Sequence, residues 1–149
     1  MSAMPKGPLL GFDYGTRRIG VAVGQGLTGT ANPVAVVNAR DGKPDWAEIE
    51  TLVSEWRPIA LVVGLPRHAD GSDNELTPRV RRFARQLAGR TGLDVHTIDE
   101  HLSSVAAERT LQHGSRRGAR DELDAMAAAC ILEDWLAQQH GYREEERGQ

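Results

Sequence analysis

Residues 9–23 read LLGFDYGTRRIGVAV, and this stretch decides the fold. Leu9–Asp13 has the apolar character of a short buried strand, and Tyr14–Arg18 has the glycine and polar residues of a turn. In Ile19–Gly24, β-branched residues alternate with glycine and alanine. That two-residue period is typical of a strand with small side chains on one face. The stretch therefore predicts an antiparallel pair of strands, the first of which ends on an aspartate.

Downstream of this pair, the pattern continues with a third strand and then alternates helices with strands. Helices are expected where apolar residues recur at a period near 3.6, and buried strands where an apolar run is short and continuous. The predicted elements are strands at Ala31–Asn38, Ile59–Val63 and Asp94–Ile98, a helix opened by Pro44, a helix that starts at Ser72 or Thr77 and ends near Arg90, a helix over Ser103–Gln112, a polar loop over 113–120 and a last helix over Glu122–Gln139.

The order of these elements predicts one α/β domain. Three meandering strands followed by two strands that are connected through helices give a five-stranded mixed sheet with helices on both faces. This is the ribonuclease H-like arrangement. A chain of 149 residues fits a single domain. We expect the domain to span residues 1–142 and the charged segment 143–149 to form a disordered tail.

Composition narrows the class of protein. With 40% hydrophobic and 26% charged residues the chain is ordinary globular material. Its net charge of −3 excludes a strongly basic nucleic-acid binder but allows a local basic patch. The apolar stretches are too short to cross a bilayer, residues 1–8 lack a signal-peptide pattern, and the single cysteine suits a reducing compartment. We expect a cytoplasmic protein with no membrane partner.

Three acidic residues are candidates for one catalytic metal site. Asp13 ends the first strand, Glu100 follows the fifth, and Asp124 lies in the first turn of the last helix. If the first and fifth strands are parallel, their carboxyl ends meet at one edge of the sheet. Carboxylates gathered without counter-charges repel, so we expect them to hold Mg²⁺ or Mn²⁺ and to act on a phosphodiester. Taken singly, each acid is equally typical of a turn, a loop or a helix start.

Arginines near these acids are candidate ligands for nucleic-acid phosphates. A guanidinium group binds phosphate in a bidentate manner, and contacts of this kind give salt-dependent binding with little base selectivity. The alternative for the arginines after residue 78 is an ordinary solvated helix face. The candidates are Arg17 and Arg18 in the first turn, Arg67 after the fourth strand, and Arg79 and Arg82 on the second helix.

Four motifs in order resemble the YqgF/RuvX family across about residues 9–142. The resemblance implies a ribonuclease H-like fold and a metal-dependent nuclease, and it carries the family's acidic triad onto Asp13, Glu100 and Asp124. Family members are described as Holliday junction resolvases and as nucleases that mature the 5′ end of pre-16S ribosomal RNA. We favour the ribosomal role, because it is attributed to bacterial members that resemble this chain. The motifs are Gly11–Val23, Val62–Pro66 with Asp70-Gly71, Asp99-Glu100 with Leu102–Ser104, and Leu123–Leu132.

Two residues depart from the family pattern. His101 stands where the family usually has arginine, and Asp121 is an unexpected acid one helical turn before Asp124. Asp121 is either a helix N-cap or a fourth ligand.

Three other functions fit the same residues. A Holliday junction resolvase would act on branched DNA, and its paired cuts favour a symmetric dimer. A non-catalytic module would bind nucleic acid without cutting it. An ATP-binding protein of the sugar-kinase kind also carries an Asp-Tyr-Gly-Thr type of loop, but it needs a second domain. The sequence is compatible with a monomer or a homodimer.

Overall fold

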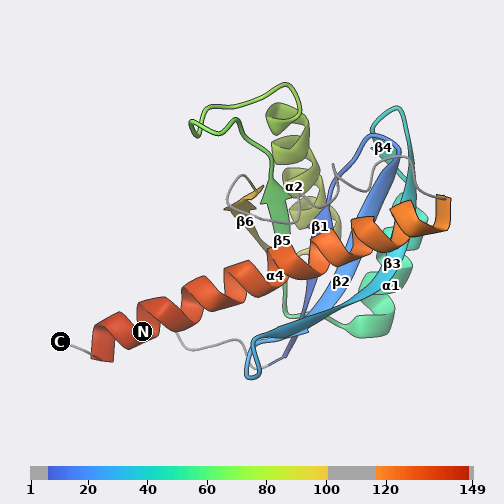
Figure 1. The fold of residues 1–149 in the computed structure, drawn as a ribbon. Helices are drawn as coiled ribbons and strands as arrows, with labels where there is room; N and C mark the ends of the chain where they lie inside the picture. Colours follow the sequence, from blue (N-terminus) through green and yellow to red (C-terminus); the bar gives the residue numbers. More distant parts are fainter. Residues whose placement is uncertain (1–6, 101–116, 148–149) are drawn as a thin grey trace.

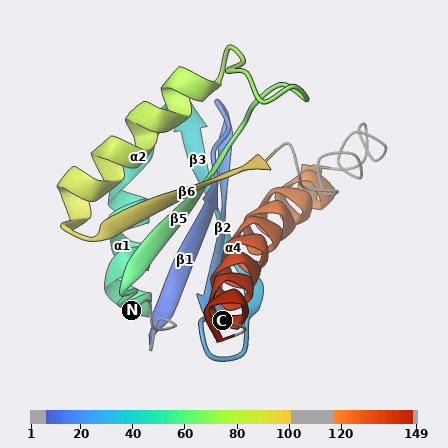
Figure 2. The same cartoon turned by 90° about the vertical axis from the view of Figure 1, so that its left-hand side faces the viewer.

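A computed structural model describes residues 7–100 and 117–147 of the chain (Figure 1). Its strands form one mixed sheet, with helices packed on both faces (Figure 2). The strands are β1 (Pro8–Asp13), β2 (Arg18–Gln25), β3 (Thr30–Arg40), β4 (Lys43–Pro44), β5 (Ala60–Leu65) and β6 (Asp94–Asp99), and the helices are α1 (Trp46–Trp56), α2 (Thr77–Thr91) and α4 (Arg117–Arg147).

The sheet has the order β4-β3-β2-β1-β5-β6. Strands β1, β2 and β3 form the predicted antiparallel meander, whereas β5 runs parallel to β1 and β6 runs parallel to β5. The carboxyl ends of β1, β5 and β6 therefore lie at the same edge of the sheet. This confirms the predicted α/β class with a mixed sheet and places the first and last long strands in the parallel relation that the site requires.

Each face of the sheet has its own hydrophobic core. On one face, Phe12 and Val21 pack with Ile49 of α1 and with Phe83 of α2. On the other face, β1 and β5 pack against α4 through a second, separate cluster that includes Leu132. The alternation of side chains along β1 and β2 thus divides their residues between two helical layers, as the two-residue period indicates.

The predicted number of five strands is wrong, because the structure has a sixth, two-residue strand. Asp41 and Gly42 have positive φ angles of 51° and 80°, which suit a two-residue hairpin turn. The chain reverses there, and β4 pairs with the end of β3. As a result Pro44 lies in a strand, and α1 begins at Trp46, behind the N-cap Asp45.

Helix α4 is longer than predicted at both ends. It begins at Arg117, inside the expected loop over 113–120, and it continues to Arg147, past the expected end of the domain at residue 142. Among its residues whose side chains are described, 122–139, the buried ones lie between Asp124 and Leu136, and apolar periodicity predicts the helix in this same stretch. The predicted helix over Ser103–Gln112 lies outside the described residues. No helix in the described part of the chain is long and apolar enough to cross a membrane.

Candidate metal and nucleic-acid site

Asp13 lies at the carboxyl end of β1 with its side chain on the α4 face of the sheet. A Cβ built on Gly11 would lie 3.0 Å from the backbone oxygen of Ala128, and one built on Gly20 would lie 1.9 Å from that of Asp124. Both glycines therefore face α4. Asp13 is two residues from Gly11 in the same strand and pairs with Gly20 across the hairpin, so it shares their face. Only 4% of Asp13 is exposed.

Glu100 reaches the same face from the other side of β5. It directly follows β6, and its side chain lies over Gly64 of β5: a Cβ on Gly64 would lie 2.8 Å from the Cγ of Glu100 and 2.5 Å from Cδ1 of Ile131 in α4. The parallel register of β1 and β5 pairs Phe12 with Val63, so the next residues along the two strands, Asp13 and Gly64, are level. Asp13 and Glu100 therefore lie at one level of the sheet, on one face, with β5 between them.

Asp124 completes the set from α4. Its backbone rests on Gly20, which is the hairpin partner of Asp13. The residue is 6% exposed, and its Oδ2 accepts a hydrogen bond from Nε of Arg18 at 2.8 Å. Because a buried carboxylate is costly without a counter-charge, Arg18 stabilises Asp124 at this position. The residue pair is 106 positions apart in the sequence.

The structure gathers the three acids at one edge without closing them into a cluster. Among residues 7–100 and the described part of α4, no group of three His, Cys, Asp or Glu side chains is close enough to hold a metal ion. The donor set itself consists of carboxylate oxygens from three elements, which are the ligands that Mg²⁺ and Mn²⁺ prefer. A divalent ion at Asp124 would compete with Arg18 for the carboxylate.

Of the candidate arginines, Arg17 and Arg67 lie beside this edge. Arg17 is exposed in the turn between β1 and β2. Arg67 is held within the protein: it donates a hydrogen bond from Nη1 to the carbonyl oxygen of Gly71 at 2.9 Å, and the same atom lies 3.3 Å from Asp73. Its Nε lies 3.0 Å from Asp99 without hydrogen-bond alignment. Arg67 thus ties the loop after β5 to the end of β6.

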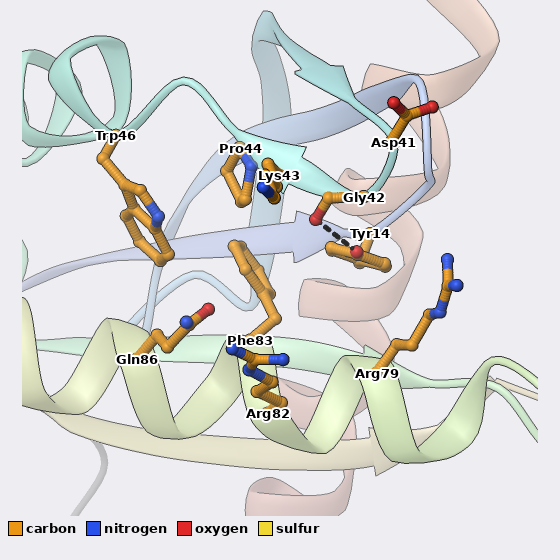
Figure 3. Close-up of a pocket in the computed structure, with 10 residues that line it drawn as sticks. All are labelled: Tyr14, Asp41, Gly42, Lys43, Pro44, Trp46, Arg79, Arg82, Phe83 and Gln86. Atoms are coloured by element: carbon orange, nitrogen blue, oxygen red, sulfur yellow. Dashed lines mark hydrogen bonds between the residues drawn. The ribbon is translucent and has the colours of Figure 1, made fainter.

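Arg79 and Arg82 lie on the opposite face of the sheet from Asp13. Both are exposed on α2, where they line a pocket together with Tyr14 and Trp46 (Figure 3). The structure therefore separates the predicted phosphate ligands into two groups, one at the acidic edge and one around this pocket. Trp46 lies at helical spacing from the apolar residues Ile49 and Val53, which predicts a core position. In the structure its side chain is only half-buried.

Some residues that shape the site are absent from the predicted set. The absence of a side chain at Gly20 lets Asp124 approach the sheet, and its absence at Gly64 does the same for Glu100. In the sequence, Gly20 belongs to the run of small residues on one face of β2, and Gly64 lies near the end of an apolar strand. His101 lies outside the described residues. Because α4 begins at Arg117, Asp121 lies inside the helix and is not its N-cap, and Asp124 lies beyond the first turn, so both of these expectations are wrong. Of Asp121 only the backbone is described.

The fold resembles that of a solved resolvase. RuvC from Thermus thermophilus, solved in complex with a Holliday junction substrate, superposes with a TM-score of 0.53 over 90% of this chain and 96% of that chain, at 20% identity. A second structure of the same protein gives a TM-score of 0.52 at 18% identity. The fold is therefore ribonuclease H-like, which confirms the predicted class.

The sequence gives a closer relationship. Residues 7–138 match the family RuvX, described as Holliday junction resolvase. A protein of Azotobacter vinelandii named "Putative pre-16S rRNA nuclease" is 55% identical over 132 residues, covering 87% of this chain and 93% of its own length. A protein of Nitrosococcus oceani with the same name is 48% identical over 136 residues, covering 91% of this chain and 90% of its own length. This chain belongs to the RuvX family, as the four motifs indicate.

Proposed function

We propose that this protein is a divalent-metal-dependent nuclease that hydrolyses phosphodiester bonds in the precursor of 16S ribosomal RNA. The observation that carries the proposal is the placement of Asp13, Glu100 and Asp124, from three separate elements, on one face at one edge of the sheet. The names of relatives 48% and 55% identical, which match this chain over most of its length, support the ribosomal RNA as substrate.

Asp13, Glu100 and Asp124 would together hold Mg²⁺ or Mn²⁺. Such an ion, when bound, supplies a Lewis acid for the phosphodiester and lowers the pKa of a bound water. The protein contributes buried positions for two of the three carboxylates, so that water is partly excluded and their charge acts in a low-dielectric setting.

Arg18 would have two partners in succession. Before an ion binds, it offsets the charge of Asp124 through their 2.8 Å hydrogen bond. An ion at Asp124 would displace the guanidinium from this carboxylate, and the guanidinium would then suit a phosphate oxygen of the bound strand. The exposed Arg17, its neighbour in the turn, would add a further phosphate contact.

A nuclease of ribosomal RNA precursors would work in the cytoplasm.

The test is cleavage by the purified protein with Mg²⁺ or Mn²⁺ on two substrates, a pre-16S leader RNA and a four-way DNA junction. We expect the RNA to be cut. Asp13→Asn and Glu100→Gln should each lower the rate at least about 100-fold, because each removes a charged ligand. Glu122→Gln is the matched control, since Glu122 is an exposed acid on α4 only two residues from Asp124; we expect it to cut at the wild-type rate.

A second candidate is a resolvase of branched DNA, which the description of the family favours. Symmetric cuts in the junction with the RNA left whole would overturn the choice of RNA and keep the nuclease. A protein that binds RNA but cuts neither substrate with either ion would overturn the nuclease itself.

A further inference from the structure

The face of the sheet opposite α4 carries a pocket that the acidic site does not use. It has a volume of about 550 Å³ and lies between the β3–β4 turn with the start of α1 on one side and α2 on the other (Figure 3). The residues that matter here are Tyr14, Gly42, Lys43, Trp46, Arg79 and Arg82.

The floor of the pocket is aromatic and firmly held. Phe83 is 1% exposed and contacts the rings of both Tyr14 and Trp46, with centroid distances of 5.1 Å and 5.7 Å. The Tyr14 hydroxyl donates a hydrogen bond to the carbonyl oxygen of Gly42 at 2.7 Å, which closes one end of the pocket (Figure 3). Trp46 is the half-buried member of this floor, and the guanidinium of Arg90 also lies over its ring, 4.4 Å from the centroid. The exposed part of Trp46 suits a flat, partly apolar group such as a nucleobase.

The rim of the pocket is cationic. Lys43, Arg79 and Arg82 line it, and Asp41 is the single acid among the lining residues. Within the described ranges, no ion pair engages any of these three cations, whereas Arg81 on the same helix is paired with an aspartate. In a chain of net charge −3, this is a local excess of positive charge, and it suits a phosphate.

The cations and the aromatic floor line the same cavity. One ligand can therefore contact both of them.

The pocket and the acidic site share one edge of the sheet. Asp13 and Tyr14 are consecutive residues, yet Asp13 faces α4 and Tyr14 packs in the core beneath α2. The two sites therefore lie on either side of the end of β1. A nucleic-acid strand laid across this edge would reach both.

We propose that this pocket binds one nucleotide of the RNA strand that the acidic site cuts, with the base against Trp46 and the phosphate on Arg79 and Arg82. The inference rests on the proposed function, because that function supplies the strand. The same chemistry, a base next to a phosphate, also describes a free nucleotide, so the experiment has to separate the two sources.

The first arm measures binding of a fluorescein-labelled single-stranded RNA by anisotropy in EDTA, so that nothing is cut. Arg82→Gln should weaken binding about tenfold, the loss of one charge-assisted contact, and should lower the slope of log K against log salt by about 0.7. Arg85→Gln is the matched control: Arg85 is exposed on the same helix but does not line the pocket. We expect it to change binding less than about twofold.

The second arm titrates the protein with AMP and follows the indole N–H resonances, which the Trp46→Phe variant assigns. We expect the Trp46 resonance to shift and that of Trp135, packed on the α4 face, to stay. If AMP shifts the Trp46 resonance but the Arg82→Gln variant binds RNA like the wild type, the pocket binds a free nucleotide. The proposal that it binds a nucleotide of the RNA strand is then wrong. If Arg82→Gln and Arg85→Gln weaken RNA binding equally, RNA contacts the charged face of α2 as a whole. The proposal that the pocket is the binding site is then wrong.

These outcomes differ from a failure of the nuclease proposal. That proposal fails when the wild-type protein with Mg²⁺ or Mn²⁺ leaves the RNA whole. The pocket is judged by binding alone, in EDTA, whatever the result of the cleavage assay.

Discussion

Replacing Gly20 with alanine places a methyl group where helix α4 rests on β2. The new Cβ would lie 1.9 Å from the backbone oxygen of Asp124, 2.3 Å from its carbonyl carbon and 2.9 Å from the backbone nitrogen of Ala125. All three are backbone atoms, so no side-chain rotation relieves the contact. For the carbon–oxygen distance to reach an ordinary value near 3.3 Å, the helix has to withdraw by about 1.4 Å.

This withdrawal should cost stability. Overpacking a core typically costs about 1–3 kcal/mol, and we expect the upper end because the helix moves as a unit away from the sheet, loosening the contacts of the fully buried Leu132 and Leu136. A loss of about 3 kcal/mol in a domain of this size corresponds to a melting temperature lower by roughly 6–12 °C. Circular dichroism with thermal and urea denaturation measures both quantities.

Gly89→Ala is the matched control. Gly89 lies inside α2, and a Cβ there would meet nothing within 4 Å. The same substitution should therefore stabilise the protein, by about 0.5–1 kcal/mol. If Gly20→Ala melts at or above the wild-type temperature, α4 does not rest on β2 as described, and the placement of Asp124 beside Asp13 is wrong.

Other contacts give further expectations. Asp45→Ala removes the side-chain acceptor at the start of α1 and should lower the free energy of unfolding by about 1 kcal/mol in urea denaturation, whereas Asp45→Asn should keep most of it. The hydrogen bond from Arg81 holds the pKa of Asp73 below its ordinary value; the stability this carboxylate contributes is therefore present above its unfolded pKa and lost as pH falls through the lower folded pKa. In the Arg81→Gln variant the pKa of Asp73 should rise toward its ordinary value, which an NMR titration measures. An unchanged pKa would contradict the ion pair between Arg81 and Asp73. Arg18→Gln removes the guanidinium that donates a hydrogen bond to the Asp124 carboxylate and should strengthen Mn²⁺ binding in calorimetry; weaker binding would show that Arg18 does not compete with the ion.

Local pattern predicts the elements that build the acidic edge. The alternation in β2 and the short apolar run of β1 place Asp13 at a strand end. The parallel relation of β1 and β6 is only a condition at the level of sequence, and the structure supplies it. The Asp41-Gly42 pair carries the signal for β4, since both residues suit a two-residue turn. The predicted helix start at Pro44 is two residues early, because the turn is followed by β4 before the helix begins at Trp46.

Contacts between distant residues are beyond local pattern. The hydrogen bond between Arg18 and Asp124 joins residues 106 positions apart, and no periodicity indicates it. The phase of α2 directs Phe83 inward, but the face of the sheet that the helix covers decides whether Arg79 and Arg82 lie beside Asp13. The pocket likewise needs Tyr14 and Trp46 both to contact Phe83 on one face of the sheet, which only the assembled fold shows.

The most direct test of the central claim is to find where a divalent ion binds. Crystals of the protein soaked with Mn²⁺ and measured near the manganese absorption edge should give an anomalous peak in contact with carboxylate oxygens of Asp13, Glu100 and Asp124, with Arg18 moved off Asp124. Asp13→Asn crystals treated in the same way should lose the peak. Manganese bound elsewhere, with these carboxylates unchanged and Arg18 still on Asp124, would contradict the account.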